Sequence, residues 1–373
     1  MGRPIYLDYN ATQPIRPEAR EAMLAALAEP SNASSIHRHG QEARRIVEQA
    51  RSEVAGLIGA DPGEIIFTAG ATEANATALG GLAVDRILVS TIEHPSVAKA
   101  VPDALRLPVD RHGIVDLGTL EECLGRIRGS ALVSLMLVNN ETGVIQPVEE
   151  ASRIVHAHGG FLHSDAAQAA GRIPIDVGRL GVDLLTVSSH KIGGPQGAGA
   201  LYVRDGGALE PLLRGGNQEG RRRAGTENVS AIAGLGAAAR LALSDLAGAD
   251  AFASLRDRVE TRLRSVAPDL VIHGAERPRI ANTSCFGAPG LLAETAVIAL
   301  DLAEISVSSG AACSSGAVEP SPVLLAMGVP EDVAREAIRV SFGWATEPED
   351  LDRLVESWSL VYRRTRAAAA SAA

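Results

Sequence analysis

A single lysine at the end of an apolar run is the residue of this sequence best placed for covalent chemistry. Residues 184–187 are apolar, a length that suits a buried strand and is too short for a helix. Two serines, a histidine and Lys191 follow, and a Gly-Gly-Pro turn comes soon after. Burial disfavours an ammonium ion, so a lysine there can be a nucleophilic amine that forms Schiff bases. A surface loop lysine is the alternative, yet the chain has only one other lysine, Lys99, against 33 arginines.

Four other predicted strands also end in polar groups. Ligands of parallel sheets bind beyond the carboxyl ends of the strands, so we expect these groups near Lys191. Ala71 and Thr72 open a helix whose free N–H groups could hold a phosphate. His94 could stack on a planar ring, and Asp165, set among small apolar residues, needs a cationic partner. Each segment alone, including residues 139–143 after a further strand, could equally be an ordinary turn or loop.

The combination of these strand ends is more specific than any one of them. A phosphate cradle, a flat ring, a buried carboxylate and a Schiff-base lysine are the parts that a pyridoxal phosphate site requires. A protonated pyridine nitrogen would be the cation that Asp165 needs. The order of the strand ends along the chain therefore predicts a pyridoxal phosphate enzyme.

The composition excludes several other classes of protein. The chain has 373 residues and a net charge of −10, which indicates a soluble protein and argues against broad nucleic-acid binding. No apolar run approaches membrane-spanning length, and the N-terminus lacks the apolar core of a signal peptide. Three cysteines without CxxC spacing argue against a disulfide framework and a zinc site. We expect a cytoplasmic protein with no membrane and no metal site.

The elements needed to position these residues can be read from the apolar pattern. Strand-like runs lie at residues 64–68, 86–90, 131–138, 160–163, 183–187 and 200–203. Helical patterns separate them, for example at 147–157, and earlier helices are expected at 18–28 and 41–58. Apolar strands that alternate with helices predict a parallel sheet covered on both faces. After about Gly248 the pattern changes to a helix at 251–266, shorter strand-like runs and a last helix at 348–363, which predicts a smaller mixed domain.

Several motifs resemble one known family over nearly the whole chain. They are residues 6–12 (YLDYNAT), 67–73 (FTAGATE), 93–94 (EH), 139–143 (NNETG), 165–168 (DAAQ), 188–191 (SSHK), 223–228 (RAGTEN) and 308–315 (SSGAACSS). The chain is similar to cysteine desulfurases of the NifS/IscS type, in the class V branch of fold-type I pyridoxal phosphate enzymes. The resemblance implies an α/β fold with a large domain (13–248) around a mostly parallel seven-stranded sheet. A smaller α+β C-terminal domain (249–373) follows, and residues 1–12 would pack on it.

The resemblance also implies a role for each residue of the site. Lys191 would carry the cofactor, Asp165 would pair with the pyridine nitrogen, and His94 would stack on the ring and act as an acid or base. The remaining ligands it implies are Gln168 for the ring hydroxyl, Ala71, Thr72, Ser188 and His190 for the phosphate, Thr226 of the neighbouring subunit of a homodimer, and Asn140 and Arg339 for the substrate carboxylate. The implied reaction converts L-cysteine to L-alanine and passes sulfur to a protein acceptor, such as an iron–sulfur scaffold.

Cys313 differs from the other two cysteines in its surroundings. Cys123 lies in a helical pattern among apolar neighbours, and Cys285 follows strand alternation, so both are expected in cores. Cys313 lies in a run of Ser, Gly and Ala, where an exposed, flexible loop would let a thiolate reach a substrate. Together with the resemblance, this predicts that Cys313 attacks the substrate sulfur and carries a persulfide.

Some features leave alternatives open. Gln13 and Ala33 replace a Thr and a Pro that are common in the family, and the chain lacks the longer C-terminal tail that some relatives use to dock a scaffold. Other class V activities, an aminotransferase or a selenocysteine lyase, would make Cys313 dispensable. A non-catalytic scaffold is the more distant alternative, against which the lysine, aspartate and histidine set argues.

Overall fold

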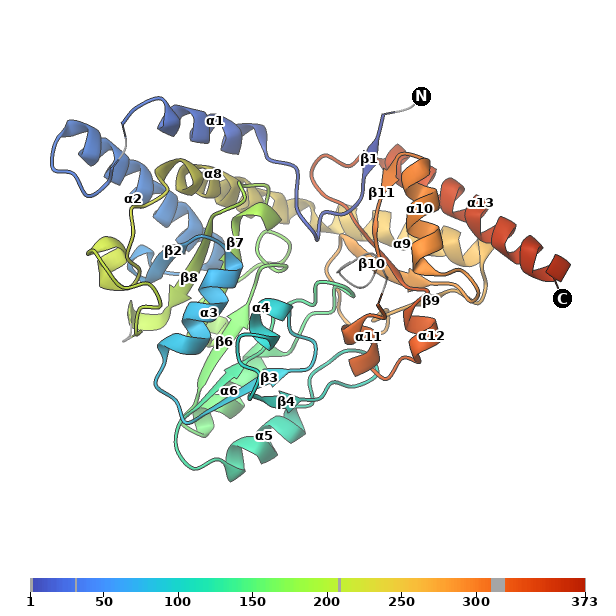
Figure 1. Ribbon diagram of the computed structural model, residues 1–373, viewed down its shortest axis with the longest axis horizontal. Coiled ribbons are helices and arrows are strands. Elements are labelled where there is room, and N and C mark those ends of the chain that lie inside the picture. The colour runs from blue at the N-terminus through green and yellow to red at the C-terminus, as the bar shows by residue number, and fades with distance from the viewer. Residues whose placement is uncertain (1–2, 31, 207–208, 310–318, 373) are drawn as a thin grey trace.

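The computed structural model describes residues 3–30, 32–206, 209–309 and 319–372. Its elements form two groups that lie end to end along the longest axis (Figure 1). The first group surrounds a seven-stranded sheet with the order β2-β8-β7-β6-β5-β3-β4. Its strands are β2 (Ile65–Thr68), β3 (Arg86–Ser90), β4 (Leu105–Leu107), β5 (Ala131–Ser134), β6 (Phe161–Asp165), β7 (Leu184–Ser188) and β8 (Gly199–Val203). β8 is antiparallel to both neighbours and all other pairs are parallel, so the predicted α/β fold is confirmed.

Helices cover both faces of this sheet, as its strands require, because β2, β5, β7 and β8 are buried along their whole length. α3 and α4 form one core with the sheet, and α2, α5, α6 and α8 form another on the opposite face. The helices are α1 (Pro17–Leu27), α2 (Arg38–Ile58), α3 (Ala71–Gly81), α4 (Pro95–Ala98), α5 (Leu117–Arg126), α6 (Val148–Ala157), α7 (Val177–Leu180) and α8 (Val229–Asp245).

α8 is apolar along most of its length. Residues 229–248 are long and apolar enough to cross a membrane by length and composition alone, and half of that window is buried in the protein. α8 packs between α1 and α2 and contributes Leu235, Ala238 and Ala239 to the core beneath the sheet. Its apolar composition is therefore that of a core helix.

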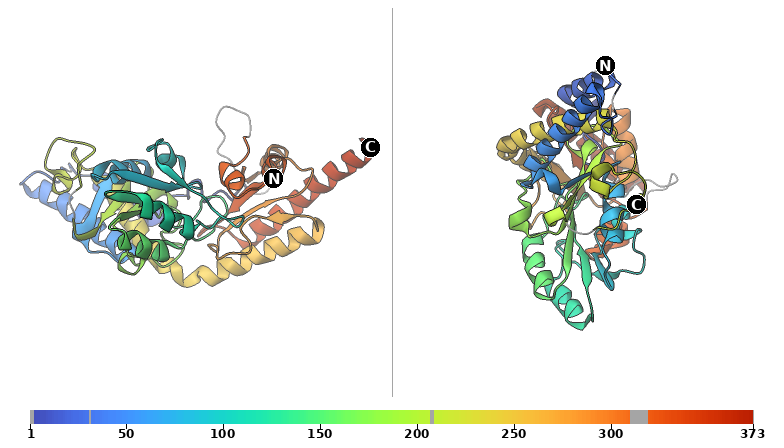
Figure 2. Two further views of the ribbon diagram at one scale, coloured as in Figure 1. Left: turned by 90° about the horizontal axis from the view of Figure 1, so that it is seen from below. Right: turned by 90° about the vertical axis from the view of Figure 1, so that its left-hand side faces the viewer.

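The second group surrounds an antiparallel sheet with the order β12-β13-β10-β9. Its elements are α9 (Ala249–Val266), β9 (Val271–Ile272), β10 (Thr283–Gly287), α10 (Ala293–Leu302), β11 (Ile305–Ser306), β12 (Ser308–Ser309), α11 (Pro322–Ala326), α12 (Glu331–Ala334), β13 (Ile338–Ser341) and α13 (Pro348–Ala372). The N-terminal strand β1 (Ile5–Tyr6) pairs with β11, and Ile5 and Leu7 join the core around Phe286 and Trp358. Figure 2 shows α9 and α13 along this end of the molecule.

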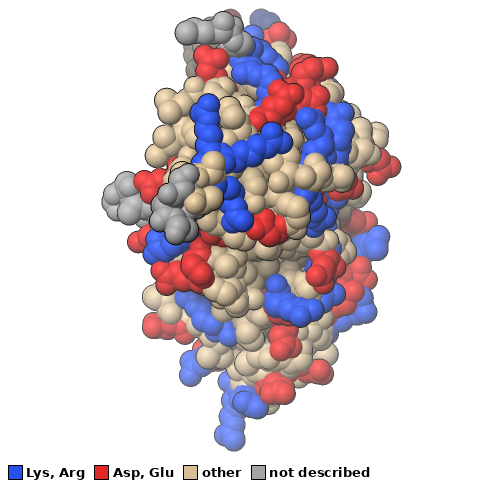
Figure 3. All heavy atoms as spheres, turned by 90° about the vertical axis from the view of Figure 1, so that its right-hand side faces the viewer, with Lys and Arg blue, Asp and Glu red and all other residues tan. Residues whose placement is uncertain are grey.

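Charges of both signs alternate on the face over this second group (Figure 3). Arg258 pairs with Asp352 at 3.2 Å between α9 and α13, and Arg335 pairs with Glu331 at 2.8 Å at α12. Because acidic and basic side chains are interspersed, this face presents no continuous field of one sign.

The structure differs from the predicted elements most clearly at three places. β4 was not predicted, because it has only three residues and two of them are exposed. The run 131–138 is a strand only as far as Ser134. Residues 135–138 remain buried, and two of their backbone N–H groups still donate to β6, from Leu135 to His163 and from Leu137 to Asp165, at 3.0 Å each. The last helix extends to Ala372 rather than 363, in keeping with the high helix propensity of the alanines there.

Candidate active site

Lys191 ends the short 3-10 turn η2 (Ser189–Lys191), directly after strand β7. Its Nζ donates hydrogen bonds to the carbonyl oxygens of Asn10, at 2.5 Å, and Ala11, at 2.8 Å. Burial lowers the pKa of Lys191 to about 7, and the charges of Arg172 and Arg339 act in the same direction. The amine is therefore substantially unprotonated near neutral pH, which is the condition for a nucleophilic lysine.

Asp165 ends the neighbouring strand β6 and is only 6% exposed. Its Oδ1 accepts a hydrogen bond from the backbone N–H of Ala167 at 2.9 Å, and its Oδ2 accepts one from Asn75 Nδ2 at 2.8 Å. Asp165 forms no ion pair within the described part of the chain. Because its hydrogen-bond donors are neutral, this buried carboxylate can still pair with a cation, such as a protonated ring nitrogen.

His94 follows strand β3 and caps α4. Its Nδ1 accepts a hydrogen bond from the backbone N–H of Ser96 at 3.1 Å and lies 2.8 Å from Ser96 Oγ. The residue is exposed, while desolvation of the ring lowers its pKa, opposed by Asp165 and reinforced by Lys191. The exposed ring beside Asp165 and Lys191 is thus available to a ligand.

The first turn of α3 lies beside the end of β7. Gly199 of β8 pairs with both Thr68 and Ser188, so the ends of β2 and β7 flank one glycine. A Cβ at Gly199 would lie 2.7 Å from the carbonyl carbon of Gly70, so only glycine permits this close approach. Ala71 and Thr72 begin α3 with no side-chain cap, which leaves N–H groups of its first turn available to an anion.

His190, in the turn η2, is the other predicted phosphate ligand at the end of β7. Its Nδ1 lies 3.2 Å from the hydroxyl of Thr12. Burial and the neighbouring charge of Lys191 lower the pKa of His190 to about 4, so the ring is neutral at physiological pH.

Gln168 links the site to the N-terminal segment. Its Nε2 donates to the carbonyl of Asn10 at 2.9 Å, and its Oε1 accepts from the buried guanidinium of Arg172. Burial lowers the pKa of Arg172 to about 9, with a contribution from Arg339. The carbonyl of Asn10 therefore accepts from both Gln168 and Lys191.

Arg339 and Asn140 meet where the two groups of elements adjoin. Arg339, on β13, donates to the backbone carbonyl of Asn140 at 3.0 Å and to Asp8 Oδ1 at 2.7 Å. Arg339 is 7% exposed, and its Nε has no hydrogen-bond partner among the residues that the structure describes. A buried guanidinium with an unused donor suits a carboxylate ligand.

Two further predicted site residues are Cys313 and Thr226. Cys313 lies outside the described residues. Thr226 is exposed, and its hydroxyl makes no hydrogen bond to any residue that the structure describes. Cys285 is buried, which raises the pKa of its thiol, and Cys123 packs against the core, as their patterns predict.

Sequence reasoning assigned no role to several residues that hold the site together. Asp8 forms an ion pair with Arg339. The carbonyl of Asn10 accepts a hydrogen bond from Lys191, and the side chain of Asn75 donates one to Asp165. Asp8 and Asn10 belong to a motif already noted, but nothing local indicated their partners. Asn75 could have been found, because it lies one helical turn after Ala71 and is the polar member of a buried helix face.

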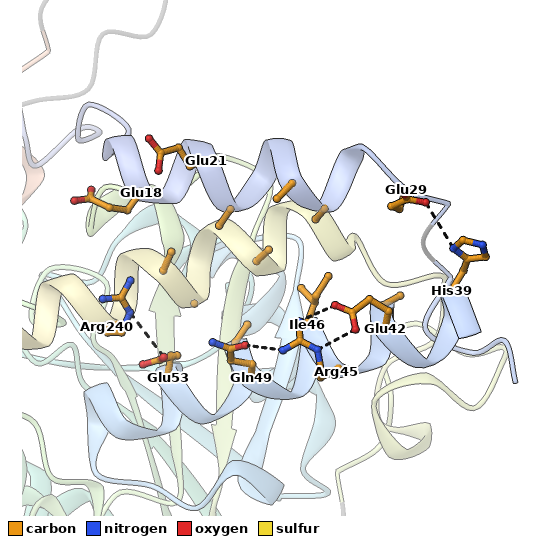
Figure 4. Close-up of a pocket in the computed structure, with 18 of the residues that line it drawn as sticks. Glu18, Glu21, Glu29, His39, Glu42, Arg45, Ile46, Gln49, Glu53 and Arg240 are labelled. Atoms are coloured by element: carbon orange, nitrogen blue, oxygen red, sulfur yellow. Dashed lines mark hydrogen bonds and ion pairs between the residues drawn. The ribbon is translucent and has the colours of Figure 1, made fainter. Parts of the chain in front are cut away.

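A groove of about 960 Å³ lies elsewhere, between α1, α2 and α8 (Figure 4). Small residues such as Ala43, Ala50 and Gly236 line it, with Glu42, Arg45 and other charged side chains also in its wall. None of the residues predicted for the site lies in it.

Comparisons with known proteins show which family this chain resembles. The family model described as Aminotransferase class-V matches residues 5–354. A cysteine desulfurase IscS of Dictyoglomus turgidum is 40% identical, covering 98% of this chain and 96% of its own. A cysteine desulfurase of Cereibacter sphaeroides is 44% identical over 94% of each chain. Among solved structures, a NifS-like protein from Rickettsia africae has a TM-score of 0.91 at 34% identity, covering 97% of this chain and 100% of its own. A structure described as SspA in complex with cysteine has a TM-score of 0.79 at 30% identity, covering 91% and 98%.

Proposed function

Because the chain belongs to the class V aminotransferase family, and within it to the cysteine desulfurases of the NifS/IscS type, we propose that it converts L-cysteine to L-alanine and transfers the sulfur to an acceptor. One observation carries the proposal from this chain's own residues. The desolvated amine of Lys191 lies in the turn after β7, and the neighbouring strand β6 ends in the buried carboxylate of Asp165. That pair suits covalent attachment of a cationic pyridine ring.

Pyridoxal phosphate fits the donor groups around this pair. When bound, it supplies an electron sink for negative charge at the substrate's α-carbon. Lys191 holds the cofactor and takes the α-proton, Asp165 pairs with the ring nitrogen, and His94 stacks on the ring. The other residues proposed to hold the cofactor are Gln168 at the ring hydroxyl and Ala71, Thr72, Ser188, His190 and the neighbouring subunit's Thr226 at the phosphate.

The substrate's groups are matched by two further parts of the chain. Arg339 and Asn140 bind the carboxylate of cysteine. The Nε of Arg339, which makes no hydrogen bond within the described part of the chain, supports this assignment. The Cys313 thiolate bonds to the substrate sulfur as the C–S bond breaks, and the carbon keeps the electron pair and becomes alanine after protonation. The solved structure described as SspA in complex with cysteine supports cysteine as the substrate.

Turnover of L-cysteine by the purified protein tests this function. Alanine and sulfide are measured in solution, and mass spectrometry locates the added sulfur on the peptide that contains Cys313. Cys313→Ser is expected to keep the cofactor and lose alanine production by orders of magnitude, since a hydroxyl is far less acidic than a thiol. Cys123→Ser is the matched control and keeps its activity. Undiminished alanine formation in Cys313→Ser would favour an aminotransferase or lyase.

The proposed enzyme is a cytoplasmic homodimer of two-domain subunits, divided near residue 248, that delivers sulfur to a protein such as an iron–sulfur scaffold. The exposed hydroxyl of Thr226, which makes no hydrogen bond to a described residue of its own chain, supports a role in a neighbouring subunit's phosphate site. Light scattering measures the assembly, and a fully active monomer would contradict it. Thr226→Ala is expected to weaken cofactor retention without dissociating the dimer.

A further inference from the structure

A chain of hydrogen bonds connects Asp165 to His94 through two residues outside the proposed cofactor contacts. Asn75 Nδ2 donates to Asp165 Oδ2 at 2.8 Å and to Ser96 Oγ at 2.9 Å. Ser96 Oγ lies 2.8 Å from His94 Nδ1, and the backbone N–H of Ser96 donates to the same nitrogen at 3.1 Å. The chain spans the end of β6, the second turn of α3 and the start of α4.

The direction of each proton in this chain follows from donor and acceptor chemistry. The Asn75 amide must turn its NH₂ group to Asp165, because the flipped amide would set two oxygens 2.8 Å apart. The Oδ1 of Asn75 is then buried with no hydrogen-bond partner among the described residues, as observed. Ser96 Oγ accepts from Asn75, so its single proton is free for His94 Nδ1. The Ser96 backbone N–H, which can only donate, faces the same nitrogen.

We propose that Ser96 and Asn75 are positioning residues that fix His94 as the neutral tautomer with its proton on Nε2. Two donors converge on Nδ1, so that nitrogen carries no proton and is closed to a ligand. Nε2 is then the nitrogen left for chemistry, and it presents an N–H group. His94 therefore acts in the resting enzyme as a hydrogen-bond donor through Nε2, and not as a base. The use of that donor in catalysis rests on the proposed function, whereas the tautomer itself does not.

Ser96 affects His94 through hydrogen bonds and not through the charges around the ring. Asp165 on β6 favours the imidazolium, and Lys191 after β7 opposes it, together with the desolvation of the ring. Removal of the Ser96 hydroxyl leaves all of these in place. It removes one donor to the neutral ring, so the proton affinity of His94 should rise by about threefold to tenfold.

Nitrogen NMR of cofactor-free protein labelled with ¹⁵N-histidine tests the proposal directly. We expect His94 Nδ1 to resonate as an unprotonated nitrogen and Nε2 as a protonated one at neutral pH, with the signals assigned by their loss in His94→Gln. Ser96→Ala should shift the Nδ1 signal and raise the pH at which His94 titrates, and Ser96→Thr should restore both. Thermal unfolding confirms that each variant folds.

A second histidine–serine pair provides a matched control. Ser134 Oγ lies 2.9 Å from Nδ1 of the buried His163, on strands of the same sheet. Ser134→Ala should alter the His163 signals and leave those of His94 unchanged. A protonated Nδ1 on His94 in the wild type, or a titration of His94 that Ser96→Ala does not move, would overturn the proposal. Absence of desulfurase turnover with the expected NMR pattern would instead reject only the proposed function.

Discussion

Two regions of the molecule differ in the solvent exposure of their charged side chains. One is the groove between α1, α2 and α8, and the other is the polar edge of the seven-stranded sheet. The groove encloses about 960 Å³, and the ion pairs beside it are exposed, such as Glu42 with Arg45 at 2.7 Å and Glu53 with Arg240 at 3.8 Å. At the sheet edge, Lys191 is partly buried without an ion-pair partner among the described residues, and Asp165 is buried in the same condition.

This contrast indicates that the proposed reactive site is distinguished by the desolvation of its ionisable groups and not by the volume of a cavity. Exposed ion pairs are screened by water and salt, so their side chains keep ordinary chemistry. Burial and the charges of Arg172 and Arg339 lower the pKa of Lys191, so a large fraction of it is a free amine near neutral pH, where a lysine in water would be charged.

The two lysines of the chain provide the largest contrast. Lys191→Ala removes the proposed cofactor attachment, so the visible absorbance that borohydride bleaches should vanish and cysteine turnover should fall by roughly a thousandfold or more. Lys99, an exposed residue after α4, is the matched control, and Lys99→Ala should change neither. A borohydride-sensitive band that persists in Lys191→Ala would refute the assignment.

The protonation of Lys191 provides the second test. Its pKa of about 7 lies below the ordinary value of 10.5, so the amine is charged below about pH 7 and free above it. Uptake of pyridoxal phosphate by cofactor-free protein should therefore slow by roughly tenfold per pH unit below about 7 and level off above it. Stopped-flow absorbance measures this rate. A rate that keeps rising up to about pH 10 would indicate an amine with ordinary solvation.

Sequence reasoning reached the part of this edge that follows from strand order. Lys191, Asp165 and His94 each lie at the end of a predicted strand or within a few residues of it, and parallel strands bring such ends together. The contacts of Asp8 with Arg339 and of Asn10 with Lys191 join residues far apart in the chain, so no local pattern indicates them. They depend on how the N-terminal segment crosses from one group of elements to the other, which periodicity does not determine.

Glu93 provides the third test, since it is a buried carboxyl group at the same edge. It accepts hydrogen bonds from Ser90 Oγ at 2.6 Å and the Met136 N–H at 2.8 Å, and burial raises its pKa from 4.5 to about 8. The folded state thus keeps a proton on Glu93 that the unfolded chain releases above about pH 4.5. The stability that this proton confers is complete below about pH 4.5 and is lost as the pH rises through about 8.

Glu93→Gln replaces this group with a neutral one that does not titrate. Between about pH 5 and pH 8, the wild type should therefore lose more stability than the variant, by up to a few kcal/mol in the free energy of unfolding. Urea unfolding at several pH values measures the difference. Glu121→Gln, at an exposed position on α5, should show the wild-type dependence, and parallel curves for Glu93→Gln would contradict a protonated Glu93.

The groove provides the smallest expected effect. Glu42 accepts two hydrogen bonds from Arg45, at 2.7 and 3.0 Å, which lower the pKa of its carboxyl group, but both side chains are exposed to water. In Glu42→Ala, the guanidinium of Arg45 loses its contact with Glu42 and is hydrated instead. Cofactor uptake, cysteine turnover and the melting temperature should therefore all match the wild type. A fall in cofactor uptake would show that the groove is energetically connected to the sheet edge. In that case, the solvent exposure of charged side chains in the groove and their desolvation at the sheet edge would not be enough to distinguish an inert surface from a reactive one.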